Sequence, residues 1–72
     1  MEDTEIAHFH GDQRMDVRLT KERIRELRAQ GAFDSRVSTR GPTAHWVAVR
    51  VAEEADVAAA VRWVEEAVRA NA

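Results

Sequence analysis

The chain has 72 residues and a mass of 8.1 kDa, so it is a single small domain or a fragment of one, and it is too short for a barrel enzyme, a nucleotide-binding α/β domain or a multidomain machine. Eleven basic and thirteen acidic side chains give a net charge of −2, which excludes a uniformly basic protein that coats nucleic acid. Cysteine is absent, which excludes a disulfide framework, a cysteine-based zinc site and a thiol nucleophile.

The first predicted element is a β-hairpin over residues 5–19. Residues 5–10 are predicted to form a short strand, and residues 11–13 form the turn. The second strand, residues 14–19, alternates with period two, and its apolar face carries Met15, Val17 and Leu19. The alternation predicts a strand that is buried on one face only.

The length of the hairpin turn decides where the histidines point. A two-residue turn pairs His8 with Met15 or Val17 and puts His8 on the core face. A three-residue loop pairs Phe9 with Met15 and turns His8 and His10 outward, because a shift of one residue moves every side chain to the other face. The sequence leaves both registers open.

A short amphipathic helix is predicted over residues 21–30. Thr20 is a suitable N-cap, and Leu19 and Ile24 have the spacing of a hydrophobic staple. Gly31 stands where a helix commonly ends in a left-handed residue.

The second half repeats the order of two strands and a helix. Residues 33–38 are predicted as a strand with Phe33, Ser35 and Val37 on one face. A turn over residues 40–43 leads to a strand at 44–51, where Val47, Val49 and Val51 alternate with Trp46, Ala48 and Arg50.

The longest predicted helix covers residues 53–70. Its valines recur at spacings of four, three and four, which predicts that one stripe faces the core: Val57, Val61, Val64 and Val68. Trp63 lies about 100–120° from that stripe. We therefore expect Trp63 to cover the rim of the core, with a contact to a partner or a second copy as the alternative.

These elements predict a ββαββα order in a single α+β domain spanning 1–72, with an ordered part of roughly 5–70. Two hairpins form a four-stranded, mostly antiparallel sheet, and two helices pack on one face of it. The other face of the sheet stays open to solvent or to a partner.

Several short motifs occur in the order of a known family: His8-Phe9-His10, Asp12, Met15-Asp16-Val17-Arg18-Leu19, a helix that ends in glycine, Trp46-Val47-Ala48-Val49-Arg50-Val51 and Asp56-Val57. Over roughly residues 8–68 this order resembles a short bacterial and fungal domain of unknown function, labelled the luciferase family or luciferase-like domain. The resemblance implies no light-emitting chemistry, since the flavin-dependent luciferases are large barrels and 72 residues cannot enclose a flavin and a long aldehyde. The chain departs from the family pattern at Gln13, Asp16, Thr20 and His45, where the family tends to have glycine, histidine, proline and glycine.

The distribution of charge along the chain indicates that the open face of the sheet is basic. Residues 14–50 carry nine basic and four acidic side chains, whereas both flanking segments are net acidic. With the valines turned toward the helices, the open face is predicted to carry Trp46, Arg50, Arg14, Arg18 and Arg36. The first interpretation is a noncatalytic binding or interaction module, with Trp46 as the anchor of a contact to another protein and the arginines fixing orientation. A homodimer is one form of that contact.

Two other functions are retained. The same face could bind nucleic acid or another anion, and the double-hairpin order resembles, in outline only, small bacterial domains described as double-winged and thought to contact DNA. A metal site or small enzyme at His8 and His10, with His45 as a third imidazole, ranks below the view that these histidines are structural. No nucleophile–base pair is recognisable, so we expect no enzyme activity, no cofactor and no metal.

The acidic N-terminus and the lack of a long apolar run predict a cytoplasmic protein without a membrane contact. The ratio of ten arginines to one lysine favours a GC-rich bacterial genome.

Overall fold

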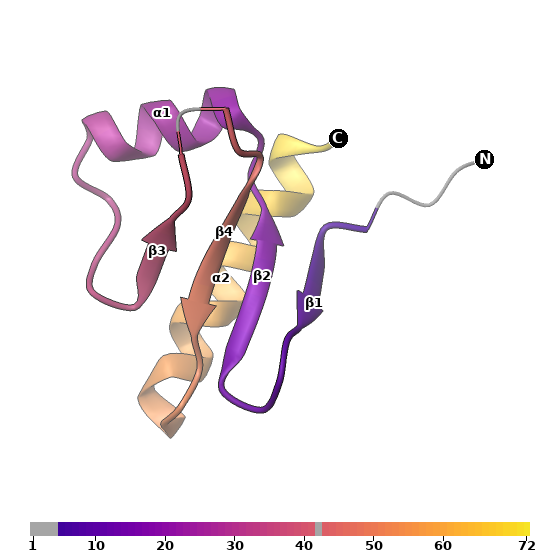
Figure 1. Cartoon of the computed structure of the whole chain (residues 1–72), viewed down its shortest axis with the longest axis vertical. Helices are drawn as coiled ribbons and strands as arrows, with labels where there is room; N and C mark the ends of the chain where they lie inside the picture. Colours follow the sequence, from indigo (N-terminus) through magenta and orange to yellow (C-terminus); the bar gives the residue numbers. More distant parts are fainter. Residues whose placement is uncertain (1–4, 42) are drawn as a thin grey trace.

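The computed structural model describes residues 5–41 and 43–72. Its elements are β1 (Ala7–Phe9), β2 (Arg14–Arg18), α1 (Lys21–Ala29), β3 (Val37–Thr39), β4 (Trp46–Arg50) and α2 (Glu54–Ala70). The strands form one antiparallel sheet in the order β1-β2-β4-β3 (Figure 1). The predicted α+β fold and its ββαββα order are confirmed. The turn expected over residues 40–43 includes Pro42, which lies outside the described residues.

The first hairpin has the three-residue loop. Phe9 pairs with Met15, and the backbone N–H of His10 donates to the carbonyl of Arg14 at 2.8 Å, so residues 11–13 form the loop. Gly11 has a φ of +82°, a conformation that glycine adopts without steric cost. His8 therefore shares a face with Asp16, its partner in β2, away from the core.

The ends of α1 follow the predicted signals. The Oγ1 of Thr20 accepts a hydrogen bond from the backbone N–H of Arg23 at 3.3 Å, which caps the first turn. At the other end Gly31 has a φ of +67°, and the N–H of Ala32 donates to the carbonyl of Leu27 at 3.0 Å. Together with the bond from Gly31 to Arg28, this is a Schellman motif.

The third strand begins later than predicted. Residues 33–36 are not in a strand, and β3 starts at Val37. The reason is a turn at Asp34: its side chain accepts the N–H of Arg36 at 2.9 Å, and its carbonyl accepts the N–H of Val37 at 3.1 Å. The turn leaves Phe33 outside the sheet and packs its ring against Trp63.

The predicted core stripe of α2 is wrong by one residue. The buried residues of this helix are Asp56, Ala60, Trp63 and Ala67, while the exposed fractions of Val57, Val61 and Val68 are 50%, 52% and 54%. Alanines on both sides of the helix make the apolar pattern ambiguous, and burial of the large indole of Trp63 selects the orientation. With an exposed fraction of 3%, Trp63 is a core residue and not a rim residue.

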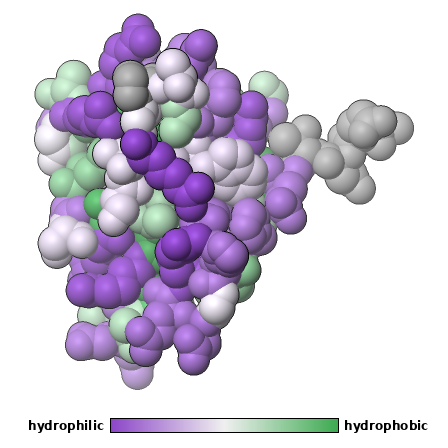
Figure 2. All heavy atoms as spheres, in the orientation of Figure 1, coloured by the Kyte–Doolittle hydropathy of each residue, from purple (hydrophilic) through white to green (hydrophobic). Residues whose placement is uncertain are grey.

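The core lies between the helices and one face of the sheet. Its buried apolar side chains come from both central strands and from both helices: Met15, Val17, Leu19, Ile24, Leu27, Val47, Val49, Ala60, Trp63 and Ala67. In Figure 1 α2 lies behind the sheet, so that the opposite, open face is turned to the viewer. Hydrophilic side chains cover most of that side of the molecule (Figure 2).

Candidate binding face

A row of basic side chains crosses one end of the open face. Arg14 in β2 is the cross-strand partner of Arg50 in β4. The strand pairing continues outward on both sides, because the N–H of His10 bonds the carbonyl of Arg14 and the N–H of Arg50 bonds the carbonyl of Arg36, both at 2.8 Å. Residues that face each other across strands share one side of a sheet. We call His10, Arg14, Arg50 and Arg36 the arginine row.

The arginine row borders a shallow hollow of about 250 Å³. Its walls combine three guanidinium groups, from Arg14, Arg36 and Arg50, with the polar side chains of Gln13, Ser35 and Ser38 and the methyl group of Ala48. Guanidinium, hydroxyl and amide groups all donate hydrogen bonds, and the arginines carry fixed positive charge. The hollow is therefore suited to an anionic group such as a carboxylate or a phosphate.

Acidic side chains already contact these arginines. The Nε of Arg36 donates a hydrogen bond to the carboxylate of Asp56, and the Nη1 of Arg36 donates one to the carboxylate of Asp34 at 2.9 Å. The hydrogen bond to Asp56 raises the pKa of the Arg36 guanidinium. The contact of Arg50 is looser: its Nε lies 4.0 Å from Asp56, beyond hydrogen-bond distance, and its side chain is 58% exposed. Arg50 is thus the member of the arginine row whose donors are most available.

Asp16 occupies the middle of the open face and is buried there, with an exposed fraction of 6%. Cationic or protonatable groups approach it from three sides: Arg14 at 3.3 Å, His8 at 3.5 Å and Arg40 at 3.5 Å. Neither the Oδ1 of Asp16 nor the Nε of Arg14 has a hydrogen-bond partner among the described residues. The sequence pattern predicts a solvated acid here, since it gives no sign that two strands and a loop direct basic groups at one carboxylate.

Trp46 lies on the same face and is half-buried. Its ring packs against the imidazole of His8, with 5.4 Å between the ring centroids. Phe9 does not share this face, because the register of the hairpin places it on the helix side of the sheet. The indole and the arginine row therefore occupy different ends of β4, with Ala48 between them.

Arg18, one of the predicted binding residues, contacts the end of α2 and is not part of the arginine row. Arg18 hydrogen-bonds the side chain of Asn71, the C-cap residue of α2, and the carbonyl of Arg18 accepts from the same side chain at 2.8 Å. The structure thus brings Arg14, Arg36 and Arg50 together and commits Arg18 to the end of the helix. Trp63, predicted as a possible interface, is enclosed in the core, so a partner contact through its indole stays a prediction without exposed surface to support it.

The histidines do not form a common site with three protein ligands. His45 accepts the backbone N–H of Lys21 on its Nδ1 at 3.0 Å, and its carbonyl accepts the N–H groups of Leu19 and Thr20. It thus fixes the start of α1. His8 and His10 lie together on the open face, 6.1 Å apart between ring centroids. Within residues 5–41 and 43–72 no group of three His, Cys, Asp or Glu side chains is arranged to hold a metal ion.

Comparison with known families adds to this geometry. A family model described as the luciferase domain matches residues 3–67, which is most of the chain. The chain belongs to the luciferase-domain family. In this luciferase-family domain the match spans every strand and nearly all of α2, so the arginine row and Asp16 lie inside the family unit.

Two further comparisons return nothing. No curated protein matches this luciferase-family domain, and no solved structure does. In the part of the chain that the structure describes, no helix has the length and apolar character needed to cross a membrane.

Proposed function

We propose that this luciferase-family domain is a noncatalytic interaction module that binds an acidic segment of another protein through its open sheet face. The observation that carries the proposal is the arginine row beside a hollow of about 250 Å³. The exposed guanidinium of Arg50 and the hydroxyls of Ser35 and Ser38 are donors on the same hollow. Charge-assisted hydrogen bonds from arginine to a carboxylate are stronger than neutral ones and have a defined geometry.

Trp46 would supply the apolar part of such a contact. Its ring is half-buried against His8, so little conformational entropy remains to be lost when a partner covers it. Tryptophan and arginine are also the residue types that most often dominate the energy of protein interfaces. Arg14 and Arg50 would orient the acidic group, and Trp46 would hold the neighbouring part of the partner segment.

An acidic protein segment suits this face better than a nucleic acid. Each of the three arginines has an acidic side chain within 4.0 Å, so the positive field of the row is partly neutralised before any ligand arrives. The whole chain is also net acidic, at −2. A polyanion needs many uncompensated charges along its backbone, whereas one or two carboxylates need a single local donor set.

The proposal is tested by a two-dimensional amide NMR titration with two probes, a pool of short Asp- and Glu-rich peptides and a pool of short DNA and RNA. We expect shifts from the peptides at residues 14, 36, 38 and 46–50. Arg50→Glu should weaken the best peptide about tenfold or more. Arg25→Glu, at an exposed position of α1, is the matched control and should leave the affinity unchanged.

Two outcomes would overturn it. Shifts that appear only with nucleic acid and disappear at physiological salt would replace the peptide partner by a nucleic acid. The absence of shifts on this face with both probes would remove the open face as a binding site.

A further inference from the structure

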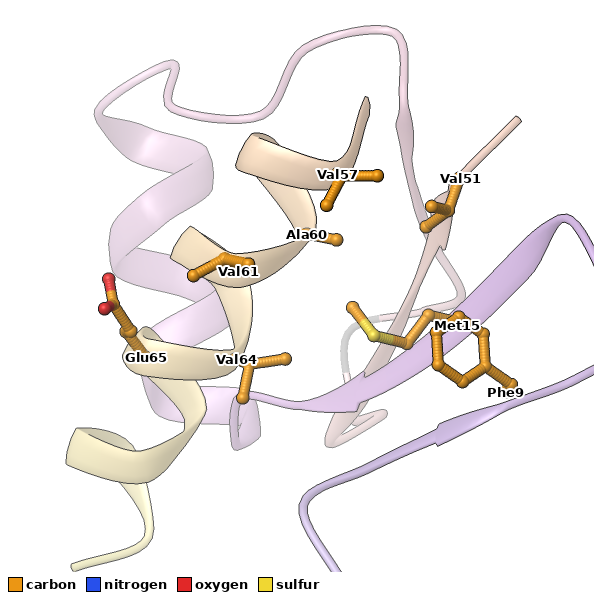
Figure 3. A pocket seen from close by; sticks show the side chains of 8 residues that line it. All are labelled: Phe9, Met15, Val51, Val57, Ala60, Val61, Val64 and Glu65. Atoms are coloured by element: carbon orange, nitrogen blue, oxygen red, sulfur yellow. The ribbon is translucent and has the colours of Figure 1, made fainter. Parts of the chain in front are cut away.

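A second surface, on the helix side of the molecule, has no role in the proposed function. One stripe of α2 carries the exposed side chains of Val57, Val61 and Val68 together with Val64, which is half-buried against the core, and we call these four residues the valine face. Next to it runs an apolar groove of about 350 Å³ between α2 and the first hairpin (Figure 3). The groove is lined by the side chains of Phe9, Met15, Val51, Val57, Ala60, Val61, Val64 and Glu65.

We propose that the valine face pairs with the valine face of a second copy of this chain, with the two α2 helices antiparallel. The first support is the spacing of the stripe. Its intervals of four, three and four are those of an apolar seam between two packed helices. A two-fold axis between Val61 and Val64 sets Val57 against Val68 of the second copy and Val61 against Val64. One patch thus serves as both halves of the contact, as a two-fold dimer requires.

Charge next to the stripe selects the antiparallel direction. Ala58 and Glu65 lie seven residues apart along the same border of the valine face. In an antiparallel pair Glu65 faces Ala58 of the second copy, and Arg69 comes near Glu54. A parallel pair would set Glu54, which lies three residues before Val57 on the same stripe, against Glu54 of the second copy, and this is unfavourable for like charges.

The extent of the surface fits an interface. A helix of 17 residues is about 25 Å long at 1.5 Å per residue, compared with 32 Å for the longest dimension of the molecule. A standard interface buries about 800 Å² per partner, roughly one-sixth of the 4879 Å² surface of this chain. Phe9, which is 66% exposed at the far wall of the groove, widens the apolar area beyond the helix. Among the described residues, the exposed large hydrophobic side chains are those of Phe9, Val57, Val61 and Val68, and all four lie on this side of the molecule.

A small apolar ligand is a weaker occupant. Sites for small molecules usually combine an apolar wall with a few polar groups that fix orientation. Here Glu65 is the single polar side chain in the lining, and its carboxylate points away from the groove (Figure 3), so the groove offers no polar group that would fix the orientation of a ligand. The valine face also continues past the groove to Val68, which a ligand in the groove would leave exposed.

The test is sedimentation equilibrium of the full chain over a concentration series. We expect the mass to rise from 8.1 kDa toward twice that value, with a dissociation constant on the order of tens of micromolar. Val61→Glu should keep the chain monomeric throughout, and Val68→Glu serves the same purpose should the first variant not fold. Ala55→Glu adds the same charge to an exposed position of α2 away from the stripe and should still dimerise.

The direction of the helices has its own readout, because the chain has no cysteine of its own. A mixture of Val57→Cys and Val68→Cys chains should form the mixed disulfide dimer faster than either variant alone forms its own. Faster dimerisation of each variant alone would overturn the antiparallel arrangement.

A wild type that stays monomeric at millimolar concentration, or a Val61→Glu variant that still dimerises, would overturn the pairing itself. A monomer whose groove binds a hydrophobic dye would assign the groove to small ligands instead. None of these results depends on whether the open face binds acidic peptides.

Discussion

The carboxylate of Asp56 accepts a hydrogen bond from the Nε of Arg36, which ties the start of α2 to the residue before β3. The Oδ2 of the same carboxylate accepts the backbone N–H groups of Ala52 and Glu53, each at 3.0 Å. These bonds lower the pKa of Asp56 from 3.8 to about 2, with the Arg36 contact as the largest cause. Two otherwise unpaired donors at the helix start and one buried acid thus satisfy each other.

We predict that Asp56→Asn lowers the melting temperature at pH 7 by about 5–10 °C. Because the pKa of Asp56 is lower in the folded than in the unfolded chain, its contribution is complete above about pH 4 and is lost as the pH falls toward 2. The difference between variant and wild type should therefore shrink between pH 5 and pH 2.5, as measured by circular dichroism melts. Asp34→Asn removes the exposed acid on the same arginine and should change little. An equal difference at both pH values would contradict this role.

The two tryptophans should differ sharply in their effect on stability. Trp63 is enclosed in the core against Phe33, and a Trp→Ala change in a core costs about 3–5 kcal/mol, as much as a domain of this size usually has. We predict that Trp63→Ala is largely unfolded at 25 °C. Trp46→Ala, on the open face, should stay folded. Urea unfolding followed by circular dichroism checks both, and a folded Trp63→Ala chain would contradict the assigned core.

Alanine substitutions at Gly31 and Gly41 test the effect of backbone strain, because the two glycines differ in their backbone conformation and not in the space around them. Neither position has a heavy atom within 4 Å of an added Cβ, so neither substitution creates a clash. Gly31, however, has a φ of +67°, which costs a residue with a Cβ about 1–2 kcal/mol. We predict that Gly31→Ala lowers the unfolding free energy by that amount, whereas Gly41→Ala is neutral within about 0.5 kcal/mol. Equal effects in chemical denaturation would mean that the Schellman motif does not limit the end of α1.

Thr20 combines a favourable side chain with an unfavourable backbone. Its Oγ1 caps α1, but its φ of 70° and ψ of 148° lie in a region that residues with a β-branched side chain rarely adopt. Replacement by glycine loses the cap but relieves the backbone, whereas alanine loses the cap and keeps most of the strain. We therefore predict that Thr20→Gly is more stable than Thr20→Ala by about 1 kcal/mol in urea titrations. The reverse order would show that the cap outweighs the strain.

Local signals in the sequence predicted the ends of α1 and the alternation of β2 and β4 correctly. Thr20 and Gly31 are specific because few other residues perform their tasks, and strict alternation leaves one face for the core. The start of β3 was missed because the Asx turn at Asp34 competes with an apparent alternation of Phe33, Ser35 and Val37. A side chain that bonds its own backbone can end a strand without changing the hydrophobic pattern.

The orientation of α2 and the centre of the open face depend on contacts between distant segments. Valine and alanine lie on adjacent stripes of α2, and it takes the capping box at Asp56 and the fit of Trp63 against Phe33 to choose between them. The three-residue hairpin loop brings His8 over Asp16, and the long return to β4 sets Arg50 beside Arg14. Neither relation is visible in a local window of sequence, although the predicted arginine face already named three members of the arginine row.

The two outer strands, β1 and β3, have three residues each. A short edge strand exposes few unpaired backbone N–H and C=O groups, so a strand from another molecule can form only a few hydrogen bonds with it. The central strands β2 and β4, whose five residues would be better templates, are enclosed between the outer ones. This protects the chain from open-ended sheet growth of the kind that leads to fibres, and any assembly it enters has to use side chains on a face of the fold.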